Sequence, residues 1–500
     1  MNDLLPHIPD QLTRILGDIP YFMPEIYLSG LFLVVLVSDL IFGKNSQGYC
    51  RAIALAGIVL VLFKDYEQYL LLKGSGVRFL FDGMLLLHQK GIAFKVVIDV
   101  LSLLLFIYFP WDDKLKAHPK GLSDLYTITI GSMLGLHLMV MAVNMLSIYL
   151  AIEFVSIASY LLVAYSSENA FSTEAGLKYV LFGAASSAIL LYGISLLYGF
   201  TGTLNLFSSD LLTNLNQAGG LSVTLALGLV LVGIGFKLSF VPVHFWVPDV
   251  YQGASTPVTA YLSTVPKIAA FALLINFLTP FISFGQIAAF DFRLILSAIG
   301  IITMIAGNFA AVAQNNVKRI LAYSSIGHTG FALMAIVTFS AQGISSLIYY
   351  LAVYAVANIA ALALATYFSN AANAANASDY RGLGLKHPIA SVSFVVVLIS
   401  LTGLPVTAGF TAKLFVFSAV YAVYQQNHDV WLMALLITGA ATTVVSLFYY
   451  IKIPLNLFLK RKKNVIDVPA ADYKLQLFCA VISLILVLVG LFPDFLYKLL

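Results

Sequence analysis

The sequence predicts an all-α integral membrane protein with about fourteen transmembrane helices. First, 60% of its residues are hydrophobic and only 10% are charged, whereas soluble globular chains carry about 25% charged residues. Second, apolar runs of about 18 or more residues recur along the chain, and each is long enough to cross a bilayer as a helix. A transmembrane β-barrel would instead show alternating stretches of about ten residues, and the sequence has none.

The apolar runs give the bounds of the expected helices. In chain order they are 22–43, 49–64, 91–110, 125–142, 143–165, 174–199, 220–245, 256–283, 291–314, 318–339, 343–369, 388–424, 430–453 and 473–492. The tightest connection lies at Asn144, and the stretch 65–90 is amphipathic and ambiguous. The N-terminus lacks the basic region of a cleavable signal, so the first membrane helix is expected to serve as an uncleaved insertion signal.

Two of the expected helices are discontinuous, because each contains a proline that removes a backbone donor. Each proline lies near a lysine, and interrupted helices at corresponding places in two halves of a chain indicate an inverted repeat. The two strings are Leu238-Ser-Phe-Val-Pro242-Val-His244 and Leu401-Thr-Gly-Leu-Pro405-Val-Thr-Ala-Gly409-Phe-Thr-Ala-Lys413. The expected parts are three N-terminal helices in 1–124, five-helix repeats in 125–283 and 291–453, and a basic loop with the last helix in 454–500.

Four charged residues fall near the middle of expected membrane helices, where insertion of a Lys, Arg or Asp costs about 2.5–3.5 kcal/mol. They are Glu153, Lys237, Lys267 and Lys413. Ion pairs that merely hold helices together are the alternative, but one carboxylate cannot pair three lysines. A buried lysine without a partner can release its proton. These residues are therefore candidates for proton transfer.

Other polar residues in the expected helices have two readings each. His244 and His328 can relay protons or serve as hydrogen-bonded packing residues, and the packing role is favoured for the deep His137. Lys178 lies a few residues into its helix, so it can take part in transfer or extend to the cytoplasmic surface. Asp99 is assigned no role.

No cofactor site is expected in this chain. The two cysteines form neither a CxxC nor an iron–sulfur or haem spacing, and the eight histidines contain no HExxH motif. There is no GxGxxG turn after a strand and no Walker A loop. Nucleotide, metal and redox centres are thus expected to be absent.

Three strings resemble those of the antiporter-like subunits of respiratory complex I, and the resemblance extends over 125–453. They are Gly235-Phe-Lys237-Leu-Ser-Phe-Val-Pro242-Val-His244-Phe-Trp246-Val-Pro-Asp249-Val-Tyr251-Gln-Gly253-Ala-Ser-Thr-Pro257-Val-Thr, Asn316-Val-Lys-Arg319-Ile-Leu-Ala-Tyr-Ser-Ser325-Ile-Gly-His328 and Tyr380-Arg-Gly-Leu. The resemblance is greatest to the N-type subunit of the bacterial enzyme. The M-type has a glutamate at the position of Lys413, and the L-type carries a long C-terminal lateral helix.

This resemblance implies a fourteen-helix fold with two inverted five-helix repeats and a proton-translocating role in a redox-driven NADH:quinone oxidoreductase. It implies that Glu153 and Lys237 form a half-channel pair, that Lys267 is the central lysine and that Lys413 opens the second half-channel. Lys178 and His244 match positions linked to the proton path.

The resemblance also implies where the redox chemistry takes place. Flavin, iron–sulfur clusters, NADH and quinone are expected in partner subunits, namely other membrane subunits and a peripheral redox arm, in the plasma membrane of a bacterium. A subunit of a cation/proton antiporter and a structural membrane scaffold are the two alternatives.

The loop charges predict the orientation, because loops rich in Lys and Arg stay in the cytoplasm. Loops after odd-numbered helices carry most of these residues, including the run Lys460-Arg461-Lys462-Lys463, whereas the other loops have few apart from 65–90 and Arg293. Both termini should therefore lie outside the cell. A cysteine placed in the 460–463 run should resist an impermeant thiol label added to intact cells, while Asp10→Cys should react. Labelling of the loop from outside would contradict this orientation.

Overall fold

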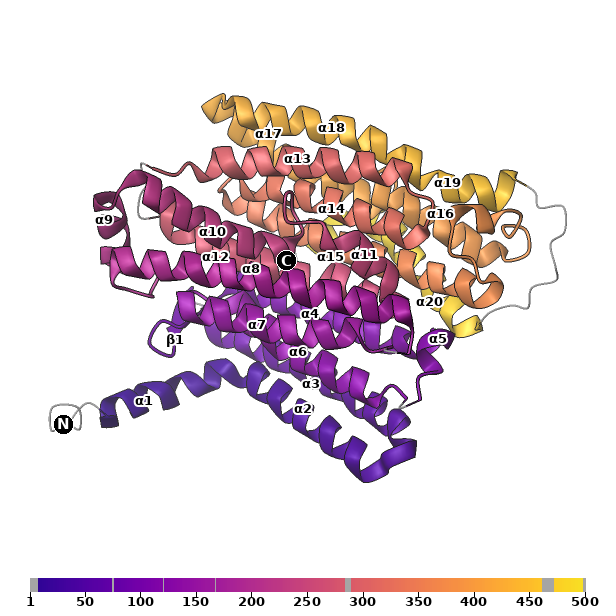
Figure 1. Ribbon diagram of the computed structural model, residues 1–500, viewed down its shortest axis with the longest axis horizontal. Helices are drawn as coiled ribbons and strands as arrows, with labels where there is room; N and C mark the ends of the chain where they lie inside the picture. Colours follow the sequence, from indigo (N-terminus) through magenta and orange to yellow (C-terminus); the bar gives the residue numbers. More distant parts are fainter. Residues whose placement is uncertain are drawn as a thin grey trace.

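The computed structural model describes residues 8–73, 76–119, 121–166, 168–283, 289–460 and 472–497. Its helices lie side by side in one bundle that follows chain order, from α2 and α3 at one edge to α17 and α18 at the other (Figure 1). The long helices are α1 (Ile8–Asp18), α2 (Met23–Phe42), α3 (Ser46–Leu72), α4 (Gln89–Tyr108), α6 (Ser123–Met141), α7 (Met145–Val163), α8 (Ala170–Thr201), α10 (Gly220–Leu238), α12 (Thr256–Ser283), α13 (Phe292–Ala313), α14 (Val317–Ile336), α15 (Ala341–Ala372), α16 (Pro388–Thr402), α17 (Ala408–Asn427), α18 (Val430–Tyr450) and α20 (Tyr473–Leu491).

Shorter elements connect these helices. They are the 3₁₀ turns η1 (Ile19–Phe22), η2 (Gly43–Asn45), η3 (Phe109–Trp111) and η4 (Ala377–Tyr380), the π-turn η5 (Leu455–Leu459), the helices α5 (Asp113–Lys116), α9 (Ser209–Gln217), α11 (Trp246–Gly253), α19 (Lys452–Pro454) and α21 (Pro493–Tyr497), and the strands β1 (Val77–Leu80) and β2 (Leu85–His88). The two strands pair antiparallel, with Val77 opposite His88.

The predicted all-α membrane fold is confirmed. Within the described residues, twelve helices are long and apolar enough to cross a membrane. Two of the fourteen expected spans do not meet this measure: α14, which carries Lys318, Arg319 and His328, and the pair formed by α16 and α17. The count of fourteen, the inverted repeats and the division into four parts stay predictions.

Several predicted bounds were wrong. The helix predicted over 49–64 runs to Leu72, and most of the rest of the 65–90 stretch forms the β-hairpin. The helix predicted over 220–245 ends at Leu238, because Ser239 adopts a left-handed φ of 63° and the chain then turns until α11. Of the basic run 460–463, residues 461–463 lie outside the described residues.

The most buried helices are α12 and α15, which pack against each other at the centre of the bundle. Every residue of α12 from Pro257 to Leu274 is buried. Pro266 has no N–H for the carbonyl of Leu262, and the buried hydroxyl of Tyr251 donates to that carbonyl at 3.3 Å. The backbone group that the proline leaves free is therefore satisfied, as an apolar surrounding requires.

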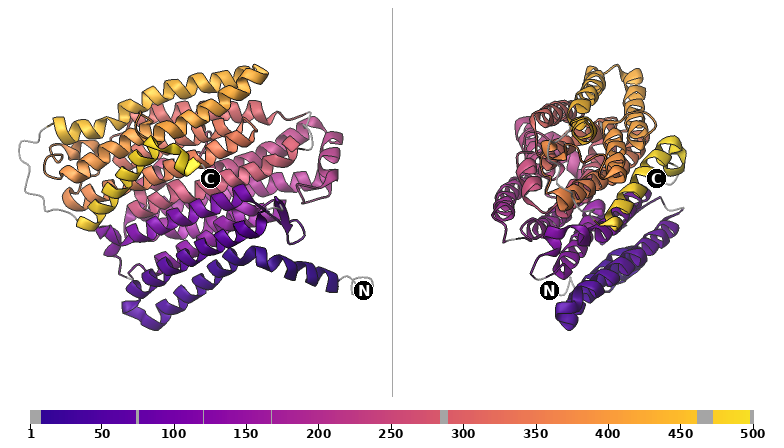
Figure 2. Two further views of the ribbon diagram at one scale, coloured as in Figure 1. Left: turned by 180° about the vertical axis from the view of Figure 1, so that it is seen from behind. Right: turned by 90° about the vertical axis from the view of Figure 1, so that its right-hand side faces the viewer.

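Close packing of small residues joins the neighbouring helices α13 and α14. A Cβ atom added at Gly307 would lie 2.4 Å from the backbone nitrogen of Gly327. Such contacts are the main attraction between helices in lipid, since lipid tails are as apolar as leucine. On the far side of the bundle, α20 runs obliquely and contacts α15, α16 and α17 (Figure 2).

The predicted break in the 388–424 helix is confirmed. The helix α16 ends at Thr402 and α17 begins at Ala408. The end of α16 depends on Gly403, whose φ of +85° favours glycine and whose N–H donates to the carbonyls of Ile399 and Ser400. A Cβ atom at Gly403 would also lie 2.7 Å from Cδ of Lys413, so the lysine stem lies directly against this glycine.

Gly403→Ala should therefore lower the free energy of unfolding through two separable effects, one on the backbone and one on the Lys413 side chain. The left-handed backbone costs about 1–2 kcal/mol for a residue with a Cβ, and displacement of the Lys413 stem adds about 1 kcal/mol or more. Gly202→Ala is the matched control, because Gly202 has a φ of +68° and open space around it. Denaturant unfolding should show the larger loss for Gly403→Ala. In a Lys413→Ala background the extra loss should vanish; if it persists, the contact between glycine and lysine is not its cause.

Candidate proton-transfer site

A row of buried polar side chains crosses the bundle between the two helix breaks. It is formed by Glu153 on α7, Lys237 on α10, Lys267 on α12, His328 on α14 and Lys413 on α17. All three lysines and the histidine are buried, and Glu153 is half-buried. We call these five residues the central row.

Lys237 and Glu153 lie near each other without forming an ion pair. The charge of Glu153 acts on Lys237, but the described residues contain no ion pair between them within 4.0 Å. Lys237 Nζ and Glu153 Oε1 are both buried and have no hydrogen-bond partner among the described residues. Instead, the ammonium faces the rings of Tyr160 and Tyr179, each at 5.7 Å. The pair is thus separated and electrically coupled.

Lys267 is held by hydroxyl groups of α14. Its Nζ donates to Ser325 Oγ at 2.7 Å and lies 3.3 Å from Thr329 Oγ1. The Thr329 hydroxyl in turn donates to the carbonyl of Leu238 at 2.9 Å. Because Leu238 follows Lys237 at the end of α10, polar groups connect the central lysine to the first helix break.

His328 lies between Lys267 and Lys413, and the charges of both lysines act on it. Its Nδ1 is 2.7 Å from the hydroxyl of Tyr350, and its Nε2 is 3.3 Å from the hydroxyl of Tyr450. A closed cavity of about 10 Å³ has both Lys267 and His328 in its lining. This volume is close to the lower limit for one buried water.

Lys413 is anchored at the second helix break. Its Nζ donates to the carbonyl of Thr402, the last residue of α16, at 2.8 Å and lies 3.3 Å from Thr443 Oγ1 of α18. It also lies 4.5 Å from the centre of the Phe331 ring. Backbone carbonyls at the end of a helix carry partial negative charge, so the break supplies a ligand for an ammonium ion.

Two of the predicted site residues lie away from the contacts of the central row. Lys178 forms ion pairs with Glu174 at 2.8 Å and Asp249 at 2.9 Å, and its side chain is 38% exposed. Asp249 also binds Arg319 at 2.8 Å, and these two cations lower the pKa of Asp249. His244 is half-buried in the turn between α10 and α11, with Nδ1 unpartnered in the described part of the chain.

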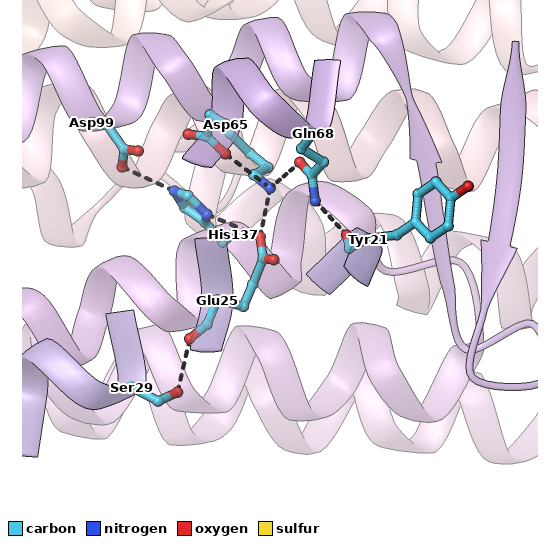
Figure 3. A network of polar contacts seen from close by, with 8 residues as sticks. Tyr21, Glu25, Ser29, Asp65, Gln68, Asp99 and His137 are labelled. Atoms are coloured by element: carbon cyan, nitrogen blue, oxygen red, sulfur yellow. Dashed lines mark hydrogen bonds and ion pairs between the residues drawn. The ribbon is translucent and has the colours of Figure 1, made fainter. Parts of the chain in front are cut away.

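Sequence reasoning missed a second group of buried charges in the N-terminal helices. Glu25, Asp65, Lys95, Asp99 and His137 meet between α2, α3, α4 and α6, and all five are 0% exposed (Figure 3). We call them the N-terminal cluster. Its signal in the sequence was Lys95 followed by Asp99, opposite charges one helical turn apart within an apolar run. The sequence favoured a packing role for His137 and gave no sign of its two carboxylate neighbours, Glu25 and Asp99.

Comparisons with known proteins identify the family. The sequence pattern described as "NADH:quinone oxidoreductase/Mrp antiporter, TM" matches residues 142–443. The chain is 38% identical over 453 residues to "NADH-quinone oxidoreductase subunit N 2" of Chloroherpeton thalassium, with 89% of this chain and 86% of the relative covered. It is 36% identical over 454 residues to "NADH-quinone oxidoreductase subunit N" of Chlorobium chlorochromatii, with 90% and 87% covered.

A solved structure supports the same assignment. A chain of respiratory complex I from Thermus thermophilus superimposes with a TM-score of 0.76 at 28% identity, covering 95% of this chain and 98% of that one. The relatives and the fold thus agree over almost the whole length, and the family pattern covers residues 142–443. The chain belongs to the NADH-quinone oxidoreductase subunit N family of antiporter-like membrane proteins.

Proposed function

We propose that this chain carries protons across the plasma membrane of a bacterium as a subunit of NADH:quinone oxidoreductase, through the central row. The observation that carries the proposal is the placement of Lys237, Lys267 and Lys413 in the bundle core with no carboxylate in ion-pair contact among the described residues. Burial without such a partner is costly for a fixed charge. It suits a group that gains and loses a proton.

Lys237 and Lys413 each lie at one of the two helix breaks. Lys237 lies in the last turn of α10, and Lys413 binds the final carbonyl of α16. Broken helices in membrane transporters offer their carboxyl ends to cations. The second break therefore stabilises an ammonium ion at a backbone carbonyl. The backbone groups freed at both breaks are places that water can reach, which supports one half-channel at each break.

The separation between Glu153 and Lys237 provides the switch. At low effective dielectric, a change of a few ångströms between opposite charges is worth on the order of kcal/mol. Approach of the carboxylate favours the protonated lysine, and withdrawal favours proton release. Since Lys237 Nζ and Glu153 Oε1 have no hydrogen-bond partner among the described residues, motion of one toward the other breaks no hydrogen bond at these atoms.

Lys267 and His328 connect the halves. Serine, threonine and tyrosine hydroxyls surround both residues, and a hydroxyl can donate and accept at once. One water in the cavity between them would complete a hydrogen-bonded path. Lys178 and His244, which lie beside this path, are assigned to proton access.

The redox chemistry belongs to partner subunits in this proposal. Flavin, iron–sulfur clusters, NADH and quinone would be held by the peripheral arm and by other membrane subunits, and this chain would convert their energy into proton movement. An antiporter subunit is the second candidate, since the fold is also shared at 18% identity and a TM-score of 0.78 with a chain of the Mrp complex from Dietzia sp. DQ12-45-1b. Co-purification of the chain with flavin and iron–sulfur absorbance would favour the oxidoreductase.

Lys237→Ala should reduce proton pumping by about tenfold or more, as loss of a positioned proton-transfer group does, while the complex still assembles. Quinone reduction should fall with it if the two are tightly coupled. Pumping is measured in proteoliposomes with a pH-sensitive dye. Lys64→Ala is the control, because Lys64 pairs with Glu67 outside the central row. Full assembly with wild-type pumping stoichiometry would refute the mechanism.

Glu153 allows a graded test of the same switch. Glu153→Gln should impair pumping because Lys237 loses its electrostatic partner. Glu153→Asp should be milder because it keeps the charge. A purely structural role predicts the opposite pattern, namely lost assembly with normal turnover in whatever complex assembles.

The division of labour has its own test. The isolated subunit should show no stoichiometric flavin, haem or iron–sulfur spectrum, because its cysteines lack the required spacing and its histidines lack a ligand motif. Absorbance and metal analysis of the purified chain check this. A bound redox centre at one per chain would contradict it.

A further inference from the structure

The N-terminal cluster lies outside the central row and has no part in the mechanism above. Its five residues come from four helices and are fully buried. Glu25 comes from α2, Asp65 from α3, Lys95 and Asp99 from α4, and His137 from α6. In the described part of the chain, every ion pair that these residues form within 4.0 Å joins two of the five. Their charges must therefore balance locally.

Lys95 is firmly held as a cation. Its Nζ lies 2.6 Å from Glu25 Oε1, 3.1 Å from Asp65 Oδ1 and 2.7 Å from Gln68 Oε1. Three oxygen atoms thus surround the ammonium group. A neutral amine would leave two buried carboxylates without a cation, so Lys95 contributes one positive charge.

His137 bridges Glu25 and the third carboxylate, Asp99. Its Nδ1 is 3.1 Å from Glu25 Oε1, and its Nε2 is 2.9 Å from Asp99 Oδ1. An ionised carboxylate only accepts hydrogen bonds, so both ring nitrogens must donate and the ring is an imidazolium ion. His137 contributes the second positive charge.

The count leaves one negative charge too many. Three ionised carboxylates against two cations would place a net charge of minus one on fully buried groups, which is strongly unfavourable. An oxygen of Asp65, an oxygen of Asp99 and a nitrogen of His137 lie within 4.8 Å of one another. Two carboxylates this close in an apolar site favour sharing a proton.

Unpartnered atoms mark where this proton belongs. Asp65 Oδ2 and Asp99 Oδ2 have no hydrogen-bond partner in the described structure, and Asp65 Oδ1 meets only the Lys95 ammonium, as an ion pair at 3.1 Å. We propose that the N-terminal cluster is a proton-binding site that holds one exchangeable proton, shared between Asp65 and Asp99.

A proton fits this site better than a metal ion. Both nitrogens of His137 already face carboxylates, and a metal at the ring would have to displace one of them. A proton, by contrast, can bind a carboxylate oxygen without displacing either carboxylate from His137. The site also has a polar exit: Gln68 links Lys95 to the carbonyl of Tyr21 at 2.5 Å. The Tyr21 ring lies beneath Arg78 of the β-hairpin, at 3.9 Å.

The test is infrared difference spectroscopy of the whole purified complex, recorded across a pH titration. A protonated carboxyl group gives a separate C=O band, and uniform [¹³C]aspartate labelling should shift it. Asp65→Asn should remove one such band, and Asp99→Asn should remove the same band because the proton is shared. Glu67→Gln is the control: Glu67 lies two residues from Asp65 on α3, its side chain is 41% exposed, and it pairs with Lys64.

The outcomes separate this inference from the central row. Loss of the band in both aspartate variants with Lys237-dependent pumping retained supports a distinct proton site. A band that neither variant alters, or none that shifts with labelled aspartate, overturns it. Disappearance of the wild-type band when Na⁺ replaces K⁺ would show that an alkali cation occupies the site and would also overturn it. If Asp65→Asn fails to assemble, Asp99→Asn and the labelled wild type decide the matter.

Discussion

The cost of removing charge from water governs this structure more than any other interaction. In the bundle core a charge gains stabilisation only from the groups that the helices bring to it. The break after Thr402 is one answer, since it exposes a backbone carbonyl that accepts from Lys413. The serine and threonine hydroxyls around Lys267 are another. Helix geometry and charge placement therefore depend on each other.

The two groups of buried charges meet this cost in opposite ways. In the N-terminal cluster every cation contacts at least two oxygens, at 2.6–3.1 Å. In the central row Lys237 Nζ contacts none among the described residues. A cation that contacts several oxygens keeps its proton. The protonation of a buried lysine that contacts none is sensitive to small movements of nearby charges. We infer that the first group stores charge and the second moves it.

Much of the fold could be predicted, because each membrane helix is a local apolar run whose length is set by the bilayer. The break near Pro405 was predictable too, since proline and glycine act locally. The interruption near Pro242 was predicted as well, but the exact end of α10 at Leu238 was not, because it depends on the left-handed Ser239. The β-hairpin within 65–90 was also missed, because a pair of four-residue strands has little periodicity.

The buried polar residues divide in the same way, into those that the local sequence reveals and those that only helix packing brings together. Glu153, Lys237, Lys267 and Lys413 stand out because a lone charge in an apolar run is visible locally. The partners of Lys95 lie 70 and 30 residues earlier in the sequence, at Glu25 and Asp65, so only the packing of α2, α3 and α4 reveals them. Tyr350 and Tyr450 were equally hidden, as two among 27 tyrosines.

The two deep histidines show how neighbours decide what one residue type can do. His328 has a tyrosine hydroxyl at each nitrogen. Because a hydroxyl can reverse from acceptor to donor by rotation, the neutral ring is satisfied in either tautomer, and its proton can change sides without movement of a helix. His137 has a carboxylate at each nitrogen, and ionised carboxylates cannot reverse. Its ring is held doubly protonated, as a fixed charge. Reversible neighbours thus suit the first histidine to the relay role proposed for it, and irreversible ones suit the second to a fixed position.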